Sequence, residues 1–355
     1  MAWLMSFAAA QAEDMSRELL ERVGFDGLVS LSDSLGGPDV QSFARRALAG
    51  ELMPDGSTPL RLLKRLLKSL KGAFTQALKA LSLPALASVM IRLLLQRRED
   101  ALALLCRICA AWVLLSRFAM AMEVAREALN AAVSVSGVVS PALASAMTLS
   151  GSAGRAALLT PASALCAGII GDVLNGVGLP LCALAAVVAC AGNLATKLQL
   201  RRLFRLLRQA VVTGTGLMMA GFVGLLSVQG RLAAAQDTTS LRAARQALGA
   251  LPIVGGQVSD SAGVLVGSAA AARNVVGATG MLLALWLCAG PALRIGLYML
   301  SIRLTGAVLE PVADAGICRI VDDFADAARM LLAIVICGAA LAAMLAGTGL
   351  AGWGV

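Results

Sequence analysis

Residues 330–350 read MLLAIVICGAALAAMLAGTGL, an uncharged run of 21 residues. A helix needs roughly 20 apolar residues to cross a hydrocarbon core of about 30 Å. Six more runs of this kind occur upstream, two of them interrupted by arginines. They are 101–122, 128–154, 173–192, 209–230, 274–293 and 295–309. We therefore expect an all-α, polytopic membrane helix bundle with about seven transmembrane helices.

The composition agrees with a membrane protein that is not an enzyme. Apolar residues make up 59% of the 355 residues and charged residues 14%, against roughly 25% charged in a soluble domain. The absence of histidine removes His-assisted hydrolysis, histidine metal sites and imidazole proton relays. The Cys-x-x-Cys pair Cys106 and Cys109 lies in an apolar run, which favours packing over redox or metal chemistry. We expect no catalytic residue, cofactor or metal.

The net charge of +9 is concentrated in two basic blocks. Nine Lys or Arg and no acidic residue lie between Arg61 and Arg98, and five more lie between Lys197 and Arg208. Leucine separates the charges, whereas a single-strand binder has aromatic stacking residues there. The pattern favours anionic lipid headgroups or a cytoplasmic loop and argues against a nucleic-acid partner.

The sequence divides into four parts. Residues 1–12 end in Ala-Gln-Ala, which resembles a signal-peptidase site, but most of an export signal is missing, so we expect a truncated signal-peptide-like segment. Residues 13–58 form a polar N-terminal segment. Residues 59–98 are basic and repeat leucine at three- and four-residue steps, which predicts amphipathic helices at the membrane interface or on the bundle. Residues 99–355 form the polytopic membrane domain.

The block 246–272 is apolar but is cut by turn-forming and charged residues. Non-helical backbone at membrane depth is tolerated only where it is buried in protein or lines water. We interpret the block as a broken or re-entrant element. Its candidate gate or hinge residues are Pro252, Gly255, Gly256 and Asp260.

Three ionisable residues lie in or beside the predicted spans and are candidates for lining water. Arg107, Arg117 and Asp172 are candidates because a charge left in lipid is expensive. The two arginines are ten residues apart and share a broad side of one helix. Three interpretations stay open: they line water, pair with Asp172, or extend to opposite interfaces.

Charge in the connecting segments predicts an orientation. The basic segment 197–208 should face the cytoplasm. Segment 310–329 carries five acidic residues against two arginines, which permits an outside location, and seven spans place the two segments on opposite sides. The same count leaves Arg61–Arg98 outside, against the rule.

Several motifs resemble the stage III sporulation protein AE family. The resemblance is clearest over 190–350. Its specific elements occur in a fixed order: Ser227-Val228-Gln229-Gly230, then Pro252-Ile253-Val254-Gly255-Gly256 with Ser259-Asp260, then Glu310-Pro311.

This resemblance implies a multi-pass protein of the mother-cell membrane surrounding the forespore. It implies a subunit, structural or pore-forming, of the channel complex linking the two cells and needed for forespore development after engulfment. The implied partners are other proteins of the same sporulation operon, including its ATPase and secretion-like ring-forming subunits, and a forespore membrane protein. Membrane lipid and further copies of the chain are also expected to bind.

Two alternatives remain. A self-contained secondary transporter or permease for a small solute would bind its substrate at discontinuous helices such as 246–272. A membrane enzyme would depend on Asp172, Asp260 or Glu310, although no reaction is indicated.

Overall fold

A computed structural model describes residues 27, 29, 30, 99–150, 152–194, 200–249, 255–310 and 315–350. For residues 99–103, 232–249, 255–270, 309 and 315 it describes the backbone alone. Within these ranges every regular element is a helix, which confirms the all-α class there. The elements are α5 (Glu99–Leu149), α6 (Ala153–Gly168), the π-helix η1 (Ile169–Gly178), α7 (Leu179–Leu194), α8 (Arg201–Gly249), α9 (Gly255–Leu309) and α10 (Ala315–Gly347).

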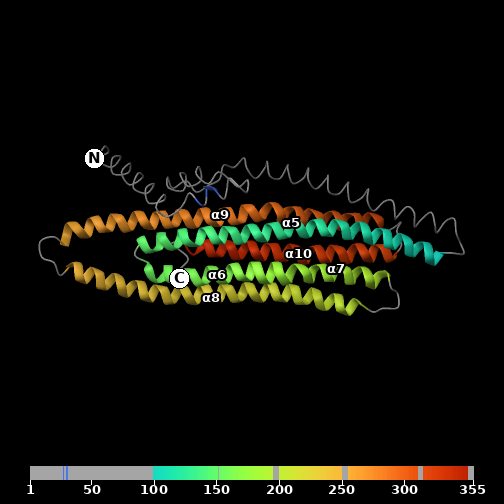
Figure 1. Cartoon of the computed structure of the whole chain (residues 1–355), viewed down its shortest axis with the longest axis horizontal. Helices are drawn as coiled ribbons and strands as arrows, with labels where there is room; N and C mark the ends of the chain where they lie inside the picture. Colours follow the sequence, from blue (N-terminus) through green and yellow to red (C-terminus); the bar gives the residue numbers. More distant parts are fainter. Residues whose placement is uncertain are drawn as a thin grey trace.

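The helices lie side by side, and successive rods run in opposite directions (Figure 1). α6, η1 and α7 join into one rod from Ala153 to Leu194. Pro180 lies two residues after the end of η1, and because proline has no N–H to donate, the backbone pattern is disturbed near this point. α5, α8 and α10 begin at the end where α7 and α9 finish. We call it the charged end, because Arg201, Arg319 and Asp326 lie there.

Five helical rods in the described ranges are long and apolar enough to cross a membrane, so the prediction of about seven spans is wrong for this region. The runs 101–122 and 128–149 belong to the single helix α5, and 274–293 and 295–309 belong to the single helix α9. Charged residues between these runs do not end the helices. They mark helical segments that continue beyond the hydrocarbon core, because α5 has 51 residues and is about 76 Å long.

Contacts between neighbouring rods bring their uncharged stretches to one level. Each stretch has about 20 residues and therefore spans about 30 Å, the thickness of a hydrocarbon core. Three thiol contacts show the alignment: Ser136 with Cys166 at 4.0 Å, Cys288 with the Ala128 carbonyl oxygen at 3.8 Å, and Cys337 with the Thr215 carbonyl oxygen at 3.6 Å. This common level is the part of the bundle that fits inside a bilayer.

The predicted orientation needs a correction. α8 and α9 are the two rods between segments 197–208 and 310–329. Because these rods are antiparallel, the chain leaves one end of the bundle in α8 and returns to the same end in α9. Both segments therefore meet at the charged end, where Arg208 contacts Asp326. The acidic residues of 310–329 balance the basic segment and do not mark an opposite side.

Several predictions fall outside the described residues or on backbone alone. The signal-like segment 1–12 and the amphipathic region 59–98 lie outside them, and of segment 13–58 only residues 27, 29 and 30 are described, with Val29 packed against the core. Pro252 lies between α8 and α9, also outside. Gly255, Gly256 and Asp260 lie in the first turns of α9, so any break in 246–272 is confined to residues 250–254. Their role as a gate stays a prediction.

α9 packs most tightly against its neighbours around Gly280. A Cβ atom placed there would lie 2.9 Å from a Val139 methyl carbon of α5 and 3.2 Å from the Ala346 Cβ of α10. Both neighbours are buried, so neither can move aside without disturbing the core. Small residues that let helix backbones approach are the usual means of helix association in lipid.

Replacing Gly280 with leucine should therefore destabilise the bundle by about 1–3 kcal/mol or more, because the core is already full. The measurement is the free energy of unfolding in mixed micelles titrated with a denaturing detergent. Gly290→Leu is the matched control, since no atom lies within 4 Å of a Cβ at Gly290 on the same helix. Equal losses for the two variants would contradict the packing described here.

Candidate functional site

The polar side chains of α10 gather on one side of its first half. Phe324 and Ala328 face the core, and Phe324 meets Phe118 of α5 edge to face at 6.0 Å. Each charged residue lies three or four positions from another one, which places them on a common face of the helix. They are Arg319, Asp322, Asp323, Asp326 and Arg329.

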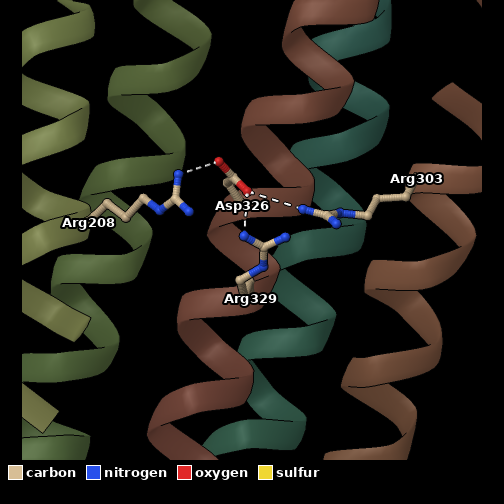
Figure 2. Close-up of polar contacts among 4 residues, drawn as sticks. All are labelled: Arg208, Arg303, Asp326 and Arg329. Carbon is tan, nitrogen blue, oxygen red and sulfur yellow. Dashed lines mark hydrogen bonds and ion pairs between the residues drawn. The ribbon is translucent and has the colours of Figure 1, made fainter. Parts of the chain in front are cut away.

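Asp326 is the centre of this face and binds three arginines from three helices (Figure 2). Arg208 Nη1 of α8 donates to Asp326 Oδ2 at 2.7 Å. On the other carboxylate oxygen, Oδ1, Arg303 Nη2 of α9 lies at 3.4 Å and Arg329 Nη1 at 3.5 Å. Asp326 is 23% exposed and the arginines 38–44%. One carboxylate thus connects α8, α9 and α10, while the arginines keep contact with solvent or headgroups.

A second carboxylate lies one turn away. Asp323 Oδ2 accepts a 2.6 Å hydrogen bond from Asn193 Nδ2 of α7, which also donates to the Ala189 carbonyl oxygen. Together with the Asp326 group, this contact joins α7, α8, α9 and α10 at the charged end. We call Asn193, Arg208, Arg303, Asp323, Asp326 and Arg329 the charged junction.

A cavity of about 330 Å³ opens beside the junction, between the end of α7, the start of α8 and α10. Most of its polar lining is positive. The described residues that line it are Val188, Ala189, Gly192, Asn193, Leu200, Arg201, Arg202, Arg205, Arg319 and Asp323. Four guanidinium groups against one carboxylate favour an anionic occupant.

The structure places the predicted intramembrane charges on two different rods. The Arg107 side chain lies over Gly316, at the start of α10, and Arg117 is exposed on α5. Asp172 is exposed in η1, close to the level at which Asn175 donates a 3.0 Å hydrogen bond to Asn130. Of the three open interpretations, none is decided by this placement, and water lining stays a prediction.

Sequence reasoning did not single out the junction. The basic segment 197–208 and the acidic segment 310–329 were both noted, but they were assigned to opposite sides. Their opposite charges could have predicted that the two segments lie together, because unbalanced charge beside a hydrocarbon core is costly. Asn193 carries no charge, and no pattern in the sequence identifies it.

Comparisons with known proteins point to one family. The family model described as stage III sporulation protein AE matches residues 60–348 of this chain. Stage III sporulation protein AE of Bacillus subtilis (strain 168) is 25% identical over 209 residues, which cover 59% of this chain and 52% of that relative. The alignment therefore spans about half of the relative's length. No solved structure matches.

The Arg208–Asp326 contact should contribute measurably to stability. A double-mutant cycle of Arg208→Gln and Asp326→Asn should give a coupling of about 0.5–1 kcal/mol, a modest value because the arginine is partly exposed. Unfolding in mixed micelles measures it. The matched cycle of Arg294→Gln with Asp326→Asn should show no coupling, since no ion pair between the two is present among the residues the structure describes. A zero value for Arg208 would contradict the junction.

Labelling tests the shared side of the two segments. In a variant without native cysteines, Arg205→Cys and Arg319→Cys should react with an impermeant thiol reagent from the same side of the membrane. Arg231→Cys, at the other end of the uncharged stretch of α8, should react from the opposite side. Labelling of positions 205 and 319 from different sides would refute the antiparallel arrangement.

Proposed function

Because the chain belongs to the stage III sporulation protein AE family, we propose that it is a membrane subunit of the sporulation channel complex. The complex links mother cell and forespore and is needed for forespore development after engulfment. The chain has a structural or pore-forming role in it. The observation that carries this proposal is the family match over residues 60–348, which covers all five rods long enough to cross a membrane.

The architecture supports a structural or conducting subunit. Five apolar rods, packed closely at small residues such as Gly280, provide a membrane scaffold. Charged residues concentrate beyond one end of the uncharged level, where a cytoplasmic or interfacial partner can reach them. We propose no catalytic step, since the sequence contains no histidine and no phosphate-binding loop.

The partners we propose are other proteins of the same operon, including its ATPase and ring-forming subunits, together with a forespore membrane protein and further copies of this chain. The membrane is that of the mother cell around the forespore. The positive-inside rule assigns the charged end to the cytoplasm.

The alternative function is a self-contained secondary transporter or permease. Such a protein transports its solute without partners. Purified chain reconstituted alone in liposomes distinguishes the two functions. Solute uptake by the chain alone favours the transporter, whereas activity only with the other complex proteins favours the channel subunit.

The test in cells introduces each substitution into the gene for this chain in the organism that carries it. Replacing Gly255 or Gly256 with tryptophan should stop forespore development after engulfment, because a bulky side chain obstructs the proposed hinge. Membrane insertion should be unchanged. The measurements are the fraction of cells that form mature spores, with engulfment followed by membrane dyes, and the amount of chain in the membrane fraction.

Gly290→Trp is the control, since its Cβ position on α9 is open. Normal spores in the Gly255 and Gly256 variants would refute the hinge. Normal spores in a strain lacking the gene would refute the channel role.

A further inference from the structure

The cavity at the charged end has more positive charge than the junction balances. Arg201, Arg202, Arg205 and Arg319 oppose the single carboxylate of Asp323 in its described lining. The carboxylate of Asp323 is already bonded to Asn193. The ion pairs that the described part of this end contains all go to Asp326, and none uses a cavity arginine. The described lining therefore carries a formal charge of +3, from four arginines and one aspartate, that an anion would offset.

The depth of the cavity matches that of lipid headgroups. On α8 the uncharged stretch begins directly after Arg208 and ends before Arg231. Arg205 and Arg201 lie three and seven residues before Arg208, about 5 and 10 Å farther along the helix axis. The headgroup layer extends about 5–8 Å beyond the hydrocarbon core on each side. When α8 spans a bilayer, Arg205 thus lies in the headgroup layer, and Arg201 lies just beyond it, from where its long side chain can extend back to the phosphates.

The rim of the cavity is apolar as well as basic. Leu206 of α8, one turn after the cavity residue Arg202, is 63% exposed. Leu200 and Val188 form part of the wall. Apolar side chains among arginines suit a ligand that joins an anion to hydrocarbon, whereas a free anion makes no use of them.

We propose that this cavity binds the phosphate headgroup of an anionic phospholipid, with the acyl chains lying along the exposed Leu206 of α8. Arginine guanidinium groups match phosphate oxygens through paired N–H donors. Free phosphate shares the headgroup chemistry, but the depth of the site and its apolar rim favour the lipid. The inference requires a membrane-embedded chain and is independent of the channel role.

The experiment uses the full-length chain purified in a neutral detergent. Native mass spectrometry measures binding of phosphatidylglycerol, of phosphatidylcholine with the same acyl chains, and of inorganic phosphate. We expect several-fold tighter binding of phosphatidylglycerol than of phosphatidylcholine. The triple variant Arg201→Gln, Arg202→Gln, Arg319→Gln should weaken phosphatidylglycerol binding about tenfold or more, because each arginine at the membrane surface attracts the anionic headgroup.

A matched triple variant removes the same charge elsewhere. Arg126→Gln, Arg231→Gln and Arg294→Gln are exposed positions that do not line the cavity, and they should change phosphatidylglycerol binding less than about twofold. Thermal unfolding of both variants identifies any loss of fold. The proposal would be overturned if the two triple variants lost phosphatidylglycerol binding equally, or if the cavity variant kept its full phosphatidylglycerol affinity. Equal affinity of the unaltered chain for the two lipids would also overturn it. If inorganic phosphate binds tightly and prevents phosphatidylglycerol from binding, the site belongs to a soluble anion. That result would overturn the proposal that the ligand is a lipid.

Discussion

The ion pair between Arg208 and Asp326 constrains the whole bundle. The two side chains are 118 positions apart in sequence and 2.7 Å apart in space, so α8 and α10 must place their charged turns at one depth. Both helices continue from there as uncharged stretches of about 20 residues, which consequently run through the same layer of bilayer. Since Arg303 joins the same carboxylate, α9 is aligned with them.

The length of the helices then explains the distribution of charge. α5 and α9 have 51 and 55 residues, more than twice the roughly 20 that a bilayer needs. The surplus must lie outside the hydrocarbon core, and there charged residues cost little. With the exception of Asp172, charge in the described helices therefore reports depth along a continuous helix, and it does not report where a helix ends. Proline is equally poor evidence of an end, because Pro141 and Pro291 lie inside α5 and α9.

This relation decides what sequence reasoning could find. The uncharged runs identified which residues are helical and apolar, and the family motifs identified the relatives. The number of spans was wrong because Arg126 and Arg294 follow or precede apolar runs just as loop residues do. The one extra span counted within α9 led to the assignment of segments 197–208 and 310–329 to opposite sides. Only the contact between these segments, which are far apart in sequence, reveals that their charges pair with each other.

The weakly held helix of the bundle is α8. Only 11% of its apolar window is buried, compared with 72% for α10, and glycines such as Gly216 and Gly224 have open space around them. Attachment at the charged end therefore matters more for α8 than for the central helices. Arg208 provides one attachment through Asp326. An anion in the adjacent cavity would contact Arg201 and Arg205 of α8 and Arg319 of α10 together, so it would add a second bridge between the same two helices. Lipid composition and the position of α8 are then coupled through a single site.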